Sequence, residues 1–148
     1  MKNSVYIATS LDGYIADNNS SVDWLCEIPN PDNNDFGFND FIKSIDAIFM
    51  GRNTFQQVLS FYAWPYPKPV YVLSSTINKL PDELSEKVMI LNIGPTEVVE
   101  RLNNEGLKNL YIDGGQVIQN FLSADLIDEL IITTIPILLG GGIPLFGS

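Results

Sequence analysis

Three short stretches carry residue types suited to binding an anion, and each follows an apolar run of strand length. They are Gly51-Arg52-Asn53-Thr54, Ser74-Ser75-Thr76 and Asp113-Gly114-Gly115. Glycine lets a ligand approach the backbone closely, and the free N–H groups at a helix start bind phosphate. Arginine adds a permanently charged, forked donor. These residue types indicate a rim that binds phosphate groups.

Each stretch also has a purely structural interpretation. A glycine pair after a strand is often a tight turn, a Ser-Ser pair often caps a turn, and a lone arginine is usually solvated. The dinucleotide fingerprint G-x-G-x-x-G is absent from the sequence. What favours a functional interpretation is that all three stretches fall at the carboxyl ends of predicted strands.

The composition excludes several other chemistries. The chain has 148 residues, of which 45% are hydrophobic, and fits one folded domain over residues 1–148. It has no histidine and a single cysteine, Cys26, so the usual zinc sites and Ser-His or Cys-His pairs cannot form and no metal site is expected. A formal net charge of −10 with eight Lys and Arg disfavours nucleic acid and anionic membranes as partners. Because no long apolar segment opens the chain, we expect a cytoplasmic protein.

Apolar runs and helical spacings alternate along the chain and predict an α/β fold. The predicted strands are 4–8, 47–50, 69–73, 88–91, 109–112 and 129–135, most of them buried on both faces. The predicted helices are centred on 38–45, 55–59, 98–102 and 117–122. Pro95 and Gly106 mark the two ends of the third helix. This order predicts a mainly parallel sheet with helices on both faces, which binds ligands beyond the carboxyl ends of its strands.

Five stretches together resemble the dihydrofolate reductase-like superfamily in order and spacing. They are IATSLDGYIA (7–16), DAIFMGRNTF (46–55), VYVLSST (70–76), LYIDGGQVIQNFL (110–122) and DELIITTIPILLGGGIPLF (128–146). More narrowly, they are similar to its bacterial branch related to the C-terminal reductase domain of the riboflavin-biosynthesis deaminase/reductase. The resemblance covers nearly the whole chain, and its specific elements are MGR-x-T, the downstream GG and LLGGG-x-P-LF.

The resemblance implies an NADPH-dependent reductase, of the dihydrofolate or phosphoribosylaminouracil reductase type, that transfers hydride to a small substrate. That substrate would be a pterin- or pyrimidine-like heterocycle or a carbonyl compound. By the resemblance, the adenosine and phosphate end of NADPH is held by Gly51, Arg52, Thr54, Leu73, Ser74, Ser75, Gly114, Gly115 and Val117. Within this set Arg52 and Ser75 would face the 2′-phosphate. The nicotinamide end is expected at Ala8, Gly13 and Ile15.

Asp12 has two interpretations. It is a turn-forming residue beside Gly13, which we favour, or a polar group near the reacting ring.

The substrate side is predicted from a count along the chain. In folate reductases a carboxylate at the start of the helix before the MGR strand binds the substrate, and the equivalent position here is Asp35, with Asp40 as a weaker candidate. Asp35 also stands where a helix-capping carboxylate belongs. Three aromatic residues, Trp24, Tyr62 and Trp64, either line the substrate site or pack in the core.

Two departures from the family pattern bear on function. No second cluster of cations is found to hold the phosphate of a riboflavin-pathway substrate. Family members continue past the PLF stretch with a further strand or hairpin, so the C-terminal hairpin is expected to be truncated and a sheet edge exposed. The alternatives to a reductase are a non-catalytic nucleotide-binding module of the same fold and a structural unit. A homodimer is a further possibility that the resemblance raises.

Overall fold

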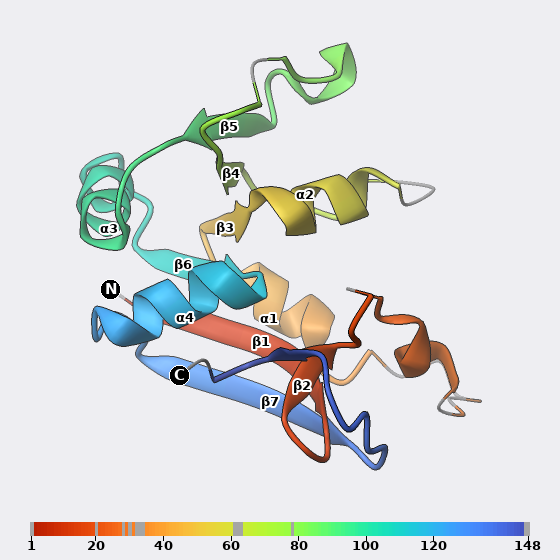
Figure 1. Cartoon of the computed structure of the whole chain (residues 1–148). Coiled ribbons are helices and arrows are strands. Elements are labelled where there is room, and N and C mark those ends of the chain that lie inside the picture. Colours follow the sequence, from red (N-terminus) through yellow and green to blue (C-terminus); the bar gives the residue numbers. More distant parts are fainter. Residues whose placement is uncertain are drawn as a thin grey trace.

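A computed structural model of the chain describes residues 2–19, 21–27, 29, 31, 35–60, 64–77 and 79–146, with only the backbone of residues 26 and 27. Its elements are, in order, β1 (Lys2–Ser10), β2 (Tyr14–Ala16), the 3₁₀ helix η1 (Asp23–Glu27), α1 (Phe38–Ser44), β3 (Ala47–Gly51), α2 (Arg52–Leu59), β4 (Val70–Leu73), η2 (Asp82–Leu84), β5 (Val88–Leu91), α3 (Pro95–Asn104), β6 (Asn109–Asp113), α4 (Gly115–Ser123), β7 (Glu129–Ile135) and β8 (Ile143–Pro144). Figure 1 shows their arrangement.

Six strands form a parallel sheet in the order β5-β4-β3-β6-β1-β7, and β2 and β8 form a separate antiparallel pair. Helices cover both faces of the large sheet: α1 and α2 pack on one face and α3 and α4 on the other (Figure 1). The predicted α/β architecture is therefore confirmed. The chain moves across the sheet in one direction up to β5 and in the opposite direction afterwards. Because crossovers between parallel strands are right-handed, the helices before and after this reversal lie on opposite faces.

The core has two layers, one on each side of the sheet. Successive residues of each strand point to opposite faces of the sheet and so contribute to opposite layers. The layer under α3 and α4 includes Val5, Phe49, Leu102, Leu110, Ile112, Ile118 and Phe121. The layer under α1 and α2 includes Phe41, Ile42, Ile48, Met50, Phe55, Val72 and Tyr111. The central strands β3 and β6 supply both layers, which is why their sequences are continuously apolar.

The strands and helices predicted from the sequence all occur, but two details differ. β7 forms an edge of the sheet, and its residues alternate between partly buried and exposed rather than being buried on both faces. The short strands β2 and β8 were not predicted, because each is stabilised by pairing with the other rather than by local pattern.

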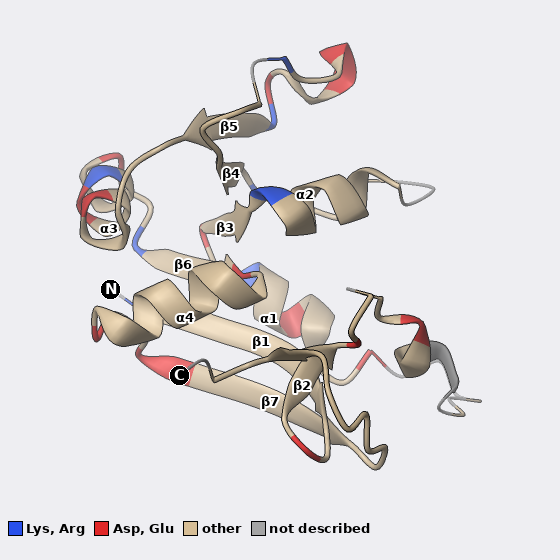
Figure 2. Ribbon diagram, viewed as in Figure 1, with Lys and Arg blue, Asp and Glu red and all other residues tan. Residues whose placement is uncertain are grey.

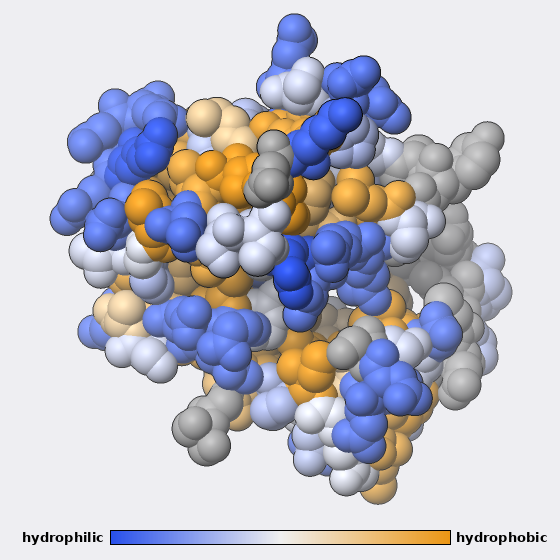
Figure 3. All heavy atoms as spheres, turned by 45° about the horizontal axis from the view of Figure 1, so that its top comes forward, coloured by the Kyte–Doolittle hydropathy of each residue, from blue (hydrophilic) through white to orange (hydrophobic). Residues whose placement is uncertain are grey.

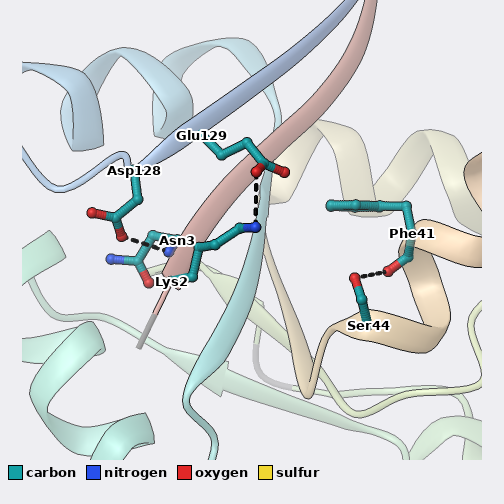
Figure 4. Close-up of polar contacts among 6 residues, drawn as sticks. All are labelled: Lys2, Asn3, Phe41, Ser44, Asp128 and Glu129. Atoms are coloured by element: carbon teal, nitrogen blue, oxygen red, sulfur yellow. Dashed lines mark hydrogen bonds and ion pairs between the residues drawn. The ribbon is translucent and has the colours of Figure 1, made fainter.

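The amino end of the sheet is fixed by contacts between β1 and the start of β7 (Figure 4). Lys2 forms an ion pair of 2.8 Å with Glu129, and the backbone N–H of Asn3 donates to the carboxylate of Asp128 at 2.8 Å. Nearby, the Ser44 hydroxyl donates to the carbonyl of Phe41 at 2.6 Å and closes the last turn of α1. These contacts lie at the end of the sheet opposite to the predicted rim.

The surface mixes chemical types. Acidic residues are spread over many elements in Figure 2, and in Figure 3 hydrophobic residues reach the surface in separate patches between hydrophilic ones. On the edge strand β7, Leu130 and Ile132 are exposed. None of the helices in the described part of the chain is long and apolar enough to cross a membrane.

The two-layer core predicts different costs for two phenylalanine truncations. Phe121 is 1% exposed and packs on Phe49 with ring centroids 5.7 Å apart, whereas Phe146 is 58% exposed. We expect Phe121→Ala to lower the free energy of unfolding by about 3–5 kcal/mol, because it leaves a cavity. Phe146→Ala is expected to change it by about 0.5 kcal/mol or less. Urea denaturation followed by circular dichroism measures both, and equal losses would contradict this assignment of the core.

Candidate active site

The three anion-binding stretches lie along one edge of the sheet. In the parallel register Gly51 of β3 is opposite Leu73 of β4, and Met50 is opposite Asp113 of β6. The strands β3, β4 and β6 therefore end at one level, and the residues that follow them form a common rim, as predicted. β1 and β7 continue past this level to Ser10 and Ile135.

Two turns of the rim touch each other. Gly114 has a φ of 94°, and a Cβ there would lie 2.7 Å from the Oγ1 of Thr54 and 3.5 Å from the backbone nitrogen of Gly51. A Cβ on Gly51 would in turn lie 3.1 Å from the Cγ2 of Val117. A side chain at position 114 would thus be strained and would also separate the turns. Four of the predicted cofactor residues, Gly51, Thr54, Gly114 and Val117, are brought together here.

Both turns open helices that begin without a side-chain cap from the N-cap residue. The N-cap residues are Gly51 for α2 and Gly114 for α4, and neither makes a side-chain capping hydrogen bond. The first amide groups of a helix point outward and carry a partial positive charge. Two such helix starts in contact provide a favourable environment for a diphosphate.

Arg52 adds the positive charge of the rim. It is the first residue of α2, where Figure 2 shows a basic segment, and its side chain is exposed. Its Nη1 donates to the Thr76 hydroxyl at 3.2 Å. Among the described residues the ion pairs are Lys2–Glu129 and Arg101–Glu105, so no carboxylate neutralises Arg52 there. The guanidinium is available to an anion.

The two serines after β4 have different environments. The Ser74 hydroxyl is buried and accepts the backbone N–H groups of Thr76 and Ile77, at 3.1 and 3.0 Å. Ser74 therefore shapes the turn that brings Thr76 to Arg52, while Ser75 is exposed at the tip. Direct cofactor contacts by Leu73, Ser74 and Ser75 stay predictions.

The segment expected at the nicotinamide end lies over the start of α4. A Cβ on Gly115 would lie 2.9 Å from the Cδ1 of Ile15 and 3.1 Å from the Cγ2 of Ile143. The strand pair β2 and β8 thus packs directly on Gly115. Gly13, with a φ of 90°, makes the turn before β2, and Ala8 lies in β1 opposite Thr133. Ile15 joins the rim, and a cofactor contact by Ala8 stays a prediction.

Asp113 is a functional candidate that sequence reasoning treated only as part of a turn. Burial raises the pKa of its carboxyl group to about 6, partly offset by the N–H of Gly114, which donates to it at 2.9 Å, and by the Tyr111 hydroxyl. Tyr111 belongs to the layer under α1 and α2, and because strand residues alternate, Asp113 points to that same face. Desolvation raises the pKa of the partly buried Tyr66, and the nearby carboxylate of Asp113 raises it further. The sequence feature that could have identified Asp113 is an acidic residue at the end of an otherwise apolar strand.

Asp35 makes the contacts of a helix-capping residue. Its carboxylate accepts the N–H groups of Gly37 at 3.0 Å and Asn39 at 3.1 Å, at the start of α1. These bonds, that of Asn39 first, lower the pKa of the exposed carboxyl group. The weaker candidate Asp40 is exposed in the first turn of α1. The N-cap residue of α1 is Gly37, so Asp35 caps the helix start from two residues earlier, and its catalytic role stays a prediction.

The aromatic candidates mostly pack. Trp24 is buried in η1, and Trp64 makes edge contacts with Phe55 and Tyr66 at centroid distances of 6.1 and 5.3 Å. Neither indole nitrogen has a hydrogen-bond partner among the described residues. Tyr62 lies outside the described residues.

The sequence profile of the RibD C-terminal domain matches residues 4–148. The chain belongs to the RibD C-terminal domain family. It is 39% identical over 148 residues to the uncharacterized protein YwjB of Bacillus subtilis (strain 168). The match covers 98% of this chain and 82% of YwjB. The resemblance inferred from the motifs is therefore confirmed, and membership of this family supports an oxidoreductase.

Solved structures agree with this assignment. A protein from Shewanella sp. PV-4, provisionally named for riboflavin biosynthesis, has a TM-score of 0.94 and is 53% identical in sequence. The match covers 100% of this chain and 84% of the Shewanella chain. A Thermotoga maritima diaminohydroxyphosphoribosylaminopyrimidine deaminase/5-amino-6-(5-phosphoribosylamino)uracil reductase has a TM-score of 0.76 at 16% identity, over 98% of this chain and 47% of that one. At that identity the likeness shows the fold alone, and this chain spans about half of that protein.

The pKa of Asp113 predicts how stability depends on pH. Because its pKa is about 6 in the folded protein against an ordinary value of 3.8, the folded state holds the proton more tightly than the unfolded chain. The stability contributed by Asp113 is therefore greatest below about pH 4 and is lost as the pH rises through about 6. Relative to Asp113→Asn, we expect the free energy of unfolding of the wild type to fall by up to about 3 kcal/mol between pH 4 and pH 7.

Urea denaturation of both proteins at several pH values measures this difference. The carboxyl groups with lowered pKa, Asp12, Asp35 and Asp46, give the opposite pH dependence, but they are present in both proteins and cancel. A difference that stays constant from pH 4 to pH 7 would contradict the raised pKa of Asp113.

Proposed function

We propose that the protein is an NADPH-dependent reductase that reduces a small, unphosphorylated heterocycle or carbonyl compound. The observation that carries the proposal is the contact between the starts of α2 and α4 beside the exposed Arg52, which forms no ion pair with the described residues. Family membership supports the same class of reaction. The proposal carries with it a cytoplasmic protein with a small-molecule partner, and a homodimer stays a prediction.

The rim fits the phosphates of NADPH. A Cβ at Gly114 would collide with Thr54, so this position keeps the backbone open, and the amides at the starts of both helices are available to the diphosphate. Arg52 and Ser75 would hold the 2′-phosphate, since both are exposed on the β4 side of the rim. The segment Gly13 to Ile15, packed over Gly115, would hold the nicotinamide. When bound, NADPH supplies the hydride.

Asp113 is the residue best suited to deliver a proton. A carboxyl group with a pKa of about 6 is partly protonated near neutral pH and can act as a general acid. Asp35 has a lowered pKa, so it is ionised under the same conditions and suits binding better than proton donation. The two carboxyl groups thus have different roles in the proposal: Asp113 donates the proton, and Asp35 caps α1 and stays a candidate for substrate binding.

The substrate is proposed to lack a phosphate because of where the cations lie. Lys2 opens β1, and Lys87 and Lys108 directly precede β5 and β6, all at the amino end of the sheet. Lys68 acts on Asp46, which precedes β3 at that same end. On the face that Asp113 points to, the described side chains include the aromatic residues Tyr6, Phe38, Trp64 and Tyr66. These suit a flat, uncharged ring.

Arg52 is expected to determine the preference for NADPH over NADH. Removing a charge-assisted contact costs about 1.5–3 kcal/mol, so Arg52→Ala should weaken NADPH binding by about 10- to 150-fold and leave NADH binding nearly unchanged. Arg101→Ala is the matched control, since Arg101 lies on α3 and its partner is Glu105. Titration followed by nicotinamide fluorescence measures both cofactors. Saturable wild-type binding below hundreds of micromolar is required, and its absence would refute the proposal.

Asp113→Asn is expected to lower turnover by about 10²- to 10⁴-fold while NADPH still binds, because only the transferable proton is lost. NADPH oxidation across a panel of pterins, pyrimidines, quinones and simple carbonyl compounds measures turnover. Asp35→Asn tests the competing assignment: if it abolishes turnover and Asp113→Asn does not, Asp35 is the proton donor. Tight NADPH binding without oxidation across the panel would favour the non-catalytic nucleotide-binding module.

A further inference from the structure

Asp12 joins two loops that lie far apart in the sequence. Its Oδ1 accepts the backbone N–H of Leu139 at 3.1 Å, and its Oδ2 accepts that of Gly140 at 2.8 Å. Oδ1 also accepts the Ser10 hydroxyl at 2.6 Å. Both oxygens of the carboxylate are therefore bonded, one to the end of β1 and both to the loop that follows β7.

Further hydrogen bonds tie the same two segments on either side of Asp12. The N–H of Leu11 donates to the carbonyl of Ile137 at 2.8 Å, and that of Leu145 donates to the carbonyl of Gly13 at 3.1 Å. The buried Ser10 hydroxyl, which donates to Asp12, accepts the N–H of Tyr14 at 3.0 Å. The turn before β2 is thus held at its start, at its centre and at its end.

This junction bears directly on the rim. β2 pairs with β8, which arrives from the loop bonded to Asp12, and the two strands place Ile15 and Ile143 against Gly115. Gly142 has a φ of 138°, and a Cβ there would clash with the carbonyl oxygen of Ala16. This junction therefore helps to position Gly13 and Ile15, which are expected at the nicotinamide.

We propose that Asp12 is a positioning residue for the cofactor site: its carboxylate locks the turn before β2 onto the loop after β7 and thereby sets Ile15 against Gly115. This inference rests on the proposed function. A carboxylate suits the task because both of its oxygens accept hydrogen bonds, whereas an asparagine amide would turn an NH₂ group toward a backbone N–H. The Ser10 hydroxyl, with the N–H groups of Gly140 and Leu139, lowers the pKa of Asp12, consistent with an ionised group. Since its oxygens are engaged in the junction, a role near the reacting ring is not needed to explain it.

The test compares Asp12→Asn with the wild type in two measurements. Hydrogen exchange reports the junction itself: the amides of Leu139 and Gly140 are expected to exchange about tenfold faster or more in Asp12→Asn, while amides of α3 do not change. Nucleotide titration reports the site: the dissociation constant and KM for NADPH are expected to rise by about tenfold, with a smaller change in kcat. Glu100→Gln, which removes an exposed carboxylate on α3, is the matched control and should change neither.

The outcomes separate the two ideas. Unchanged exchange at Leu139 and Gly140 would refute the junction, and faster exchange with unchanged NADPH binding would refute the positioning role. Should the wild type fail to bind NADPH, the proposed function and the cofactor role of Asp12 would both fall. If Asp12→Asn does not fold, Ser10→Ala serves instead: it should speed exchange at Tyr14 and weaken NADPH binding by a smaller factor, and no effect on either would overturn the inference.

Discussion

The contact between the turn after β3 and the turn after β6 is the constraint on which the site depends. Because Gly114 has no side chain and a φ of 94°, the backbone at Gly51 and the hydroxyl of Thr54 can approach it. That approach places the starts of α2 and α4 together, so their partial positive charges act on one small region. It also seats Val117 against Gly51, which connects the rim to the buried layer under α4.

This arrangement concentrates positive charge at one place on an acidic protein. With a formal net charge of −10, the molecule as a whole repels a polyanionic ligand. Local positive charge must overcome that repulsion, and the exposed Arg52 adjoins the two helix starts that supply it. The carboxyl group of Asp113 lies at the same end of the sheet and points to the face covered by α1 and α2, where burial keeps it partly protonated. One end of the sheet thus carries both the positive charges that can bind an anion and a carboxyl group that can hold a proton.

Much of the fold was predictable because its central strands are buried on both faces. Continuous apolar runs such as residues 47–50 and 109–112 leave few alternatives, and helix boundaries at Pro95 and Gly106 followed from local backbone chemistry. The rim was predictable for the same reason, since parallel strands end together. The pair β2 and β8 was not, because neither strand has enough residues to show a pattern and each depends on the other.

The chemistry of the carboxyl groups was the least predictable part, and the reason is physical. Asp12, Asp35 and Asp113 look alike in sequence, each near a glycine, yet two have lowered pKa values and one a raised value. The difference depends on how many N–H groups reach each carboxylate and how much water is excluded, which only the tertiary structure sets. For Asp12 the decisive donors lie at Leu139 and Gly140, at the other end of the chain.

This distribution of roles has a consequence for specificity. The residues that form the phosphate rim are fixed by backbone contacts between β3, β6 and two helices, which tolerate little change of side chain. The face toward which Asp113 points is instead lined by side chains from α1, from the segment before β4 and from β1. Substitutions there would alter the shape offered to a substrate without moving the glycines of the rim. A scaffold of this kind can keep one cofactor while its substrate changes, because backbone contacts fix the rim whereas side chains from other elements shape this face.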